Sequence, residues 1–157
     1  MGNYVETNGI KLHYLERPGD GPTLLLAPGL AAGAHFYLTL MDRLAPRLHV
    51  IAFDLRGRGA SDKPDTGYTM ADHAADMVGA MDALGIDRVA FGGHSFGGLL
   101  TYILAAYYPE RIERGVVIDA PAEVGLEVGI HTQIVLHVGT AVADGQAGSA
   151  TVRWVGG

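Results

Sequence analysis

The 157-residue sequence contains no cysteine. This absence excludes disulfide bonds, cysteine-ligated zinc and a thiolate nucleophile, and leaves serine and histidine as the plausible groups for nucleophilic catalysis. Lysine and arginine number 11 against 17 aspartates and glutamates, which gives a formal net charge of -6. Because no block of basic residues offsets this charge, we expect neither nucleic acid nor an anionic membrane as a partner.

The sequence also lacks an apolar run long enough to span a bilayer. Residues 1–6 have neither the charged start and apolar core of a secretion signal nor the Ser or Thr that N-myristoylation requires at the sixth position. We therefore expect a cytoplasmic protein. A chain of this length, 48% hydrophobic, can form one globular domain that buries about 68–70% of its unfolded surface.

The first structural pattern is a β-hairpin. Two strand-like runs, Asn3–Thr7 and Ile10–Glu16, are joined by Asn8-Gly9, a pair that readily adopts the positive φ angles of a tight turn. Four short runs that are apolar on both faces follow at spacings typical of strand–helix–strand units. These runs are Thr23–Ala27, His49–Asp54, Arg88–His94 and Gly115–Asp119. The pattern predicts an α/β fold with an antiparallel hairpin followed by a mostly parallel sheet.

Three helices are expected between these strands. The clearest covers residues 70–84, where apolar residues repeat at the helical period, Thr69 and Asp72 resemble a capping box, and Gly85 is a C-terminal stop. A second helix is expected from Ala34 to Leu44. The third begins at Phe96 or Gly97 and must end before Pro109, because proline disfavours helical geometry in the residue that precedes it.

The pattern becomes ambiguous after Pro121. Valines and His131 recur at helical spacing, but Gly125, Gly129 and Gly139 would each cost a helix about 1 kcal/mol relative to alanine. Alternatively, Thr132–Val138 could form a strand that pairs with Ala150–Val155. We therefore divide the chain into a core over residues 1–121 and an atypical tail over residues 122–157, in which helix and hairpin both remain open.

The strongest chemical signal is the segment Gly93-His94-Ser95-Phe96-Gly97-Gly98. It contains a Gly-x-Ser-x-Gly sequence directly after a predicted strand and directly before a predicted helix. In that context the serine occupies a strained turn, its hydroxyl stands clear of the sheet, and the helix N-terminus points toward developing negative charge. Ser95 is therefore the candidate nucleophile.

Four stretches together resemble the α/β-hydrolase family in its serine-esterase-like branch. These stretches are Leu24–Leu30, Asp54–Ser61, the segment around Ser95, and Tyr108–Arg111 with Val116–Asp119. The resemblance covers roughly residues 3–121 and implies that Ser95 is the nucleophile, with the backbone N–H groups of Phe96 and Leu30 forming the oxyanion hole. Epoxide hydrolases and dehalogenases of the family have aspartate at this position, so the serine favours acyl transfer, with no cofactor and no metal.

The resemblance places the catalytic acid and histidine late in the chain. Asp119, at a strand end, stands where some family members hold the acid, although it could equally be a structural strand-end aspartate. Of the histidines, only His131 and His137 follow Ser95, so they are the candidate bases, and we favour His137. The loop Asp54–Ser61 is expected to be structural, and the side chain of His94 is expected to point into neighbouring packing.

These observations predict a serine hydrolase that cleaves a small-molecule carboxyl ester, or a related acyl compound, through an acyl-enzyme. The alternative is a non-catalytic or truncated member of the fold that binds a ligand or partner. The family's last two strands have no recognisable counterpart, which would leave the edge of the Gly115–Asp119 strand unpaired. We expect the tail and a second copy of the chain, in a homodimer, to cover it, and the dimer could supply the missing histidine.

Overall fold

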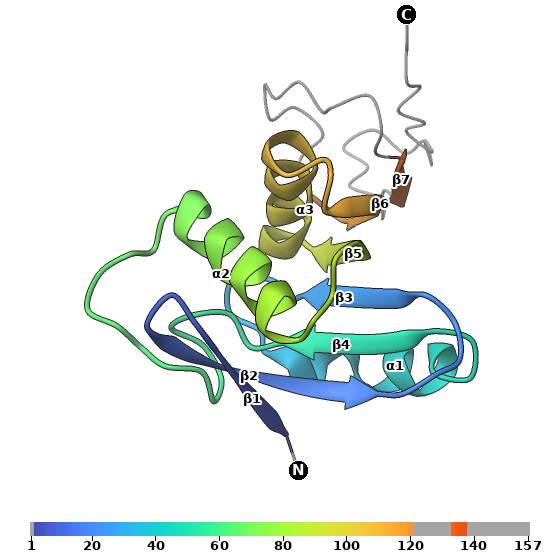
Figure 1. The fold of residues 1–157 in the computed structure, drawn as a ribbon, viewed down its shortest axis with the longest axis horizontal. Helices are drawn as coiled ribbons and strands as arrows, with labels where there is room; N and C mark the ends of the chain where they lie inside the picture. The colour runs from blue at the N-terminus through green and yellow to red at the C-terminus, as the bar shows by residue number, and fades with distance from the viewer. Residues whose placement is uncertain (1, 121–132, 138–157) are drawn as a thin grey trace, which may run out of the picture.

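The computed structural model describes residues 2–120 and 133–137 (Figure 1). Their elements are β1 (Asn3–Thr7), β2 (Ile10–Arg17), β3 (Thr23–Ala27), the 3₁₀ helix η1 (Ala34–Tyr37), α1 (Leu38–Leu44), β4 (His49–Phe53), α2 (Met70–Ala83), β5 (Val89–His94), α3 (Phe96–Tyr107), β6 (Ile112–Ile118) and β7 (Gln133–His137). Within the described residues, no helix is both long and apolar enough to cross a membrane.

The strands form one sheet in the order β1-β2-β4-β3-β5-β6-β7. The β1–β2 and β2–β4 pairs are antiparallel, and all the remaining pairs are parallel. Asn8 and Gly9 have φ angles of 47° and 75°, which confirms the predicted hairpin turn. The sheet therefore has the predicted form, with the carboxyl ends of β3, β4, β5 and β6 along one edge.

The apolar residues of β3 and β4 alternate between two cores, one on each face of the sheet. Leu25 and Phe53 pack in the core beneath α2 and α3, whereas Leu26 and Val50 pack in the core with η1 and α1. Because helices cover both faces, strands that are apolar on both sides are stable here. Truncating a core residue such as Leu25 to alanine is expected to cost about 2–5 kcal/mol.

Helix α2 confirms the sequence signals at both of its ends. The side chain of Thr69 accepts a hydrogen bond from the backbone of Asp72, and the Asp72 side chain accepts one from the backbone of Thr69 in return. Gly85, just beyond the helix, has a φ of 70°, the left-handed conformation that ends helices at low cost when the residue is glycine.

Two predicted boundaries were wrong. The predicted helix 34–44 is a 3₁₀ turn followed by α1, because the Tyr37 hydroxyl is tied to the strand ends by hydrogen bonds to Ala27 and His94. Strand β6 begins at Ile112 rather than Gly115. The exposed pair Glu113 and Arg114 hid its apolar pattern, and a register irregularity lies opposite, between Val89 and Ala90 of β5.

The tail contributes β7, which runs parallel to β6. Of the two readings left open for this segment, the structure has the strand over Gln133–His137, and its described partner is β6. The proposed pairing partner Ala150–Val155 lies outside the described residues. The edge of β6 is therefore covered by the tail, as we expected, and the expected contribution of a second copy stays a prediction.

Candidate active site

Ser95 lies at the sharp junction between β5 and α3. Its φ and ψ angles are 52° and -110°, a conformation that L-residues rarely adopt and that carries backbone strain. The two flanking glycines are required by close backbone approaches. A Cβ atom on Gly93 would collide with the backbone of Gly97, and one on Gly97 would collide with the carbonyl of Ala27. The Gly-x-Ser-x-Gly pattern is therefore explained by local sterics.

The sharp turn at Ser95, which we call the elbow, is also hydrogen-bonded to the neighbouring strand β6. The N–H of Ser95 donates to the carbonyl of Ile118 at 2.9 Å. Phe96 is the first residue of α3, and an N–H group in the first helical turn has no carbonyl within the helix to bond. Such a group can stabilise negative charge that develops beside Ser95.

The loop after β3 lies directly against this elbow. A Cβ atom added to Gly29 would be 3.1 Å from Nδ1 of His94 and 3.7 Å from Cβ of Ser95. Leu30, the next residue, has 62% of its surface exposed. The chain therefore passes the candidate nucleophile at Gly29, and Leu30, whose N–H is the predicted second oxyanion donor, follows directly.

Tyr37 connects the two strand ends that carry these groups. Its hydroxyl donates to the carbonyl of Ala27 at 2.8 Å, and it accepts the backbone N–H of His94 at 3.0 Å. Burial raises the pKa of Tyr37 to about 12, so the hydroxyl stays protonated and able to donate. No sequence motif predicts this link between the strand ends, which we call the Tyr37 brace, because it depends on where the 3₁₀ turn packs.

Asp119 follows β6 with a φ of 48°. Its side chain is 59% exposed, and its Oδ2 is 3.8 Å from Nε2 of His94. The His94 ring stacks on Phe36, with 5.5 Å between the ring centroids, so it partly packs as expected and partly faces Asp119. The structure thus brings Ser95, His94 and Asp119 together at one edge of the sheet.

The other candidates lie in the tail. The backbone of His137, the last residue of β7, is in register with Ile118 of β6, and Ile118 is in register with His94 of β5. His137 therefore belongs to the same sheet edge as Ser95. His131 lies outside the described residues, and the choice between the two histidines stays a prediction, as does the homodimer.

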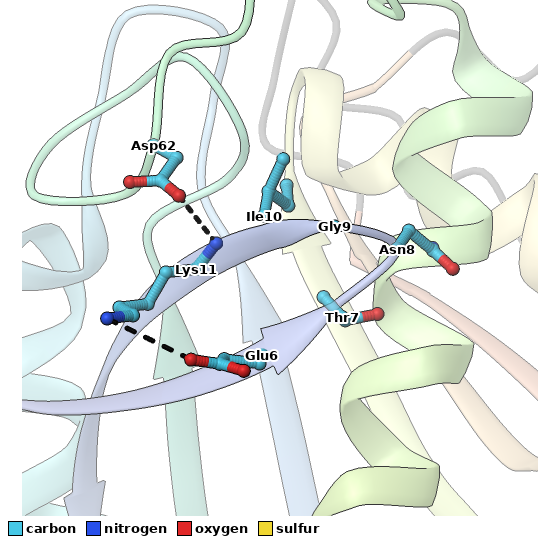
Figure 2. A pocket seen from close by; sticks show the side chains of 7 residues that line it. All are labelled: Glu6, Thr7, Asn8, Gly9, Ile10, Lys11 and Asp62. Atoms are coloured by element: carbon cyan, nitrogen blue, oxygen red, sulfur yellow. Dashed lines mark hydrogen bonds and ion pairs between the residues drawn. The ribbon is translucent and has the colours of Figure 1, made fainter.

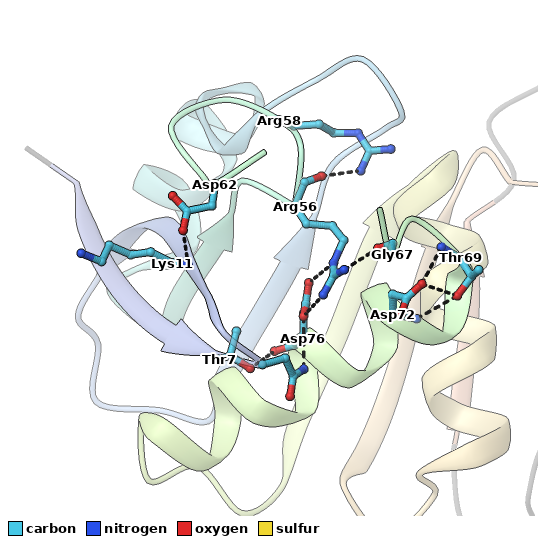
Figure 3. Close-up of polar contacts among 10 residues, drawn as sticks. Thr7, Lys11, Arg56, Arg58, Asp62, Gly67, Thr69, Asp72 and Asp76 are labelled. Atoms are coloured by element: carbon cyan, nitrogen blue, oxygen red, sulfur yellow. Dashed lines mark hydrogen bonds and ion pairs between the residues drawn. The ribbon is translucent and has the colours of Figure 1, made fainter. Parts of the chain in front are cut away.

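The loop from Asp54 to Ser61 has the expected structural role at two of its charged residues. Asp54 accepts the backbone N–H groups of Ala34 and Ala60 at 2.6 and 2.8 Å and contacts His13 at 2.8 Å. Arg56 makes two hydrogen bonds of 2.6 Å to the carboxylate of Asp76 on α2 and a further bond to the carbonyl of Gly67 (Figure 3). Both side chains are buried and hydrogen-bonded within the fold.

Arg58 in the same loop has different surroundings, and no sequence pattern predicted its place beside the candidate site. Its Nε donates to the carbonyl of Leu30 at 2.5 Å, and its guanidinium carbon lies 4.7 Å from the centroid of the Phe96 ring. His73 meets that ring edge-on at 5.0 Å. Burial and the nearby Arg58 charge lower the pKa of His73 to about 4. Arg58 therefore contacts both residues whose N–H groups we assigned to the oxyanion hole.

A separate hollow of about 400 Å³ lies at the tip of the β1–β2 hairpin (Figure 2). Its carboxylates are paired within it, because Asp62 accepts the backbone N–H of Lys11 at 2.8 Å and Glu6 lies 3.9 Å from the Lys11 ammonium. Strands β2, β4 and β3 separate β1 from β5, so this hollow is not part of the Ser95 site. Within residues 2–120 and 133–137, no cluster of three or more metal-binding side chains is present.

The fold and this site together define a class of protein. The family model described as alpha/beta hydrolase fold matches residues 22–139, which is more than half of the chain and includes β7. The chain therefore belongs to the α/β-hydrolase family. The match extends 18 residues beyond residue 121, where the sequence resemblance ended.

Relatives and solved structures agree with this assignment. The chain is 37% identical over 115 residues to a 2-(acetamidomethylene)succinate hydrolase of Mesorhizobium japonicum, covering 73% of this chain and 41% of the relative. It is 36% identical over 121 residues to an N-formylmaleamate deformylase of Pseudomonas putida, covering 76% and 45%. The enol-lactonase structure from Burkholderia xenovorans superposes with a TM-score of 0.72 at 33% identity, covering 75% and 46%.

The chain thus spans less than half of the length of these relatives. Their printed names describe hydrolases of varied substrates, and the similar proteins also include an epoxide hydrolase of Siraitia grosvenorii.

Proposed function

We propose that this chain is a serine hydrolase that cleaves carboxyl esters or related acyl compounds through an acyl-enzyme at Ser95. The observation that carries the proposal is the φ of 52° at a non-glycine residue between β5 and α3. Such a strained strand-to-helix turn is the geometry that exposes a nucleophilic hydroxyl in front of a helix N-terminus. Its position at the carboxyl edge of the parallel strands is where open α/β sheets bind ligands.

In the proposed reaction, Ser95 Oγ attacks the carbonyl carbon while a histidine takes the hydroxyl proton. The backbone N–H groups of Phe96 and Leu30 stabilise the oxyanion. The alkoxide leaves with the proton from the histidine, and water then hydrolyses the acyl-enzyme by the same route. Asp119 is the proposed acid that orients the histidine.

His137 is our proposed base. The support is backbone register, since β7 ends beside β6 at the level of His94 and Ile118. The closeness of Asp119 to the same edge is consistent with an acid–histidine pair there. His137→Ala is expected to lower the turnover of an ester by several orders of magnitude, because triad members act as a unit. Near wild-type turnover would transfer the assignment to His131.

The acyl class includes amides as well as esters. The Mesorhizobium and Pseudomonas relatives are named as a hydrolase of an acetamido compound and a deformylase. Although an epoxide hydrolase is also similar, serine at position 95 favours acyl transfer, because the family's epoxide hydrolases are expected to have aspartate there.

The decisive test is burst release of p-nitrophenol from p-nitrophenyl butyrate, which reports acylation separately from turnover. Wild-type chain should give a burst that approaches one equivalent, and a fluorophosphonate should label Ser95. Ser95→Ala should abolish both while the circular dichroism spectrum is unchanged, with Thr39→Ala on the exposed face of α1 as the control. A folded wild-type chain with neither burst nor label would favour the alternative, a non-catalytic binding protein.

A further inference from the structure

Arg58 is a half-buried cation that pairs with no carboxylate among residues 2–120. Its guanidinium makes the bond to the Leu30 carbonyl already described and a longer contact of 3.4 Å from Nη1 to the carbonyl of Arg56. An arginine has five N–H donors, and within the described residues Nη2 makes no hydrogen bond. Burial lowers the pKa of Arg58, and only the nearby Tyr68 opposes this effect.

Burying a guanidinium without an anion is unfavourable, which is why buried charges in proteins are usually paired. Arg56, two residues earlier, follows that rule with the Asp76 carboxylate. Arg58 instead lies between two turns at Gly57 and Gly59, whose φ angles are 77° and 52°. A Cβ on Gly57 would collide with the Tyr68 ring, and one on Gly59 would collide with Asp54, so the turn that presents Arg58 is tightly packed.

The side chain of Arg58 extends toward the loop after β3 and the start of α3, the two segments beside Ser95. Figure 3 shows Arg58 extending away from Asp76 while Arg56 points toward it. The Arg58 guanidinium contacts the Phe96 ring and the Leu30 carbonyl. Since these two residues flank the proposed oxyanion hole, an acyl group bound there would pass close to the unpaired N–H groups.

We propose that Arg58 binds a carboxylate on the acyl part of the substrate, so that this site prefers esters or amides of dicarboxylic acids over neutral acyl compounds. The proposal rests on the hydrolase function proposed above. Arginine matches a carboxylate because its planar N–H groups can form two parallel, charge-assisted hydrogen bonds. A neutral acyl chain would shield this cation from water without giving it an anionic partner.

The test compares two ester probes with the same leaving group, mono-p-nitrophenyl succinate and the neutral p-nitrophenyl butyrate. The quantity measured is the ratio of their kcat/KM values for wild type, Arg58→Gln and Lys63→Gln. Lys63 is the matched control, because it is a cation of the adjacent chain segment whose ammonium bonds only to the carbonyls of Gly59 and Ser61 among the described residues.

We expect Arg58→Gln to lower the succinate-to-butyrate ratio at least tenfold and Lys63→Gln to change it less than twofold. If Arg58 only positioned Leu30 and Phe96, both substrates would be affected alike, so an unchanged ratio would overturn the proposal. An equal fall in both variants would also overturn it, because the effect would then come from the general field of the loop. If Arg58→Gln does not fold, Arg58→Lys, which keeps the charge but loses the planar fork, should lower the ratio severalfold.

A binding experiment separates this proposal from the hydrolase proposal. In the Ser95→Ala background, calorimetry with the hydrolytically stable anilides should show N-(4-nitrophenyl)succinamic acid binding at least tenfold tighter than N-(4-nitrophenyl)butyramide, and Arg58→Gln should remove that difference. Such binding in a chain that shows no burst would refute the serine chemistry and retain the carboxylate site. Equal binding of both probes to Ser95→Ala would refute the carboxylate site, whatever the wild-type activity.

Discussion

Arg56 and Arg58 lie two residues apart in one loop but have opposite surroundings. Arg56 is buried against the Asp76 carboxylate, which raises its pKa, and burial without a carboxylate among the described residues lowers the pKa of Arg58. The first holds the loop onto α2, and the second reaches the Leu30 carbonyl and the Phe96 ring beside Ser95. The contrast separates a charged residue whose carboxylate partner lies within the fold from one without such a partner among the described residues, to which our proposal assigns a ligand.

The largest effect is expected from breaking the Arg56–Asp76 pair. Arg56→Met should lower the free energy of unfolding by about 3–5 kcal/mol, because it leaves a buried carboxylate without its cation. Arg58→Met should cost less, about 1–2 kcal/mol, the range of a cation–π contact that is partly shielded from water. Urea denaturation of both variants measures the difference.

A double variant refines this test. Arg56→Met combined with Asp76→Leu should recover most of the lost stability, since neither charge is then buried alone. Equal destabilisation by the Arg56 and Arg58 single variants would contradict the distinction between the two arginines.

His73 of α2, whose ring contacts the Phe96 ring, should make the free energy of unfolding depend on pH. Its folded pKa of about 4 lies below the ordinary value of 6.5, so between these values the unfolded chain binds a proton that the native state excludes. This contribution to stability is present above pH 6.5 and is lost as the pH falls toward 4, by up to about 3 kcal/mol.

His73→Leu should therefore flatten the fall in unfolding free energy between pH 7 and pH 4.5, measured by urea denaturation. The same substitution at the exposed His35 serves as the control variant. Parallel curves for wild type and His73→Leu would show that His73 is not responsible for the dependence.

A smaller effect is expected at Tyr37, which braces the strand ends beside the site. Tyr37→Phe leaves the N–H of His94 and the carbonyl of Ala27 without their partner, and should cost about 1–3 kcal/mol of stability. Tyr107→Phe, at an exposed tyrosine, should change the unfolding free energy by less than about 0.5 kcal/mol. An unchanged urea midpoint for Tyr37→Phe would mean that the two hydrogen bonds of the Tyr37 hydroxyl do not contribute to stability.

Local patterns in the sequence predicted most of the architecture correctly. The Asn8-Gly9 turn, the Thr69–Asp72 capping box and the Thr23–Ala27 strand are confirmed, because each depends on residues adjacent in the chain. The start of β6 and the split of the 34–44 helix were missed. Both are set by pairing with distant residues, such as Ile112 with Val89 and Tyr37 with Ala27.

The sequence by itself determined the elbow around Ser95, since only glycine fits the close approaches at positions 93 and 97. Only the tertiary structure decided which charged side chains of the Asp54–Ser61 loop have a buried polar partner elsewhere in the fold. Asp54 and Arg56 find partners 20 residues away, at Ala34 and Asp76, whereas Arg58 meets a carbonyl and an aromatic ring. Pairing between segments distant in sequence depends on how the elements pack, and no spacing along the chain encodes it directly.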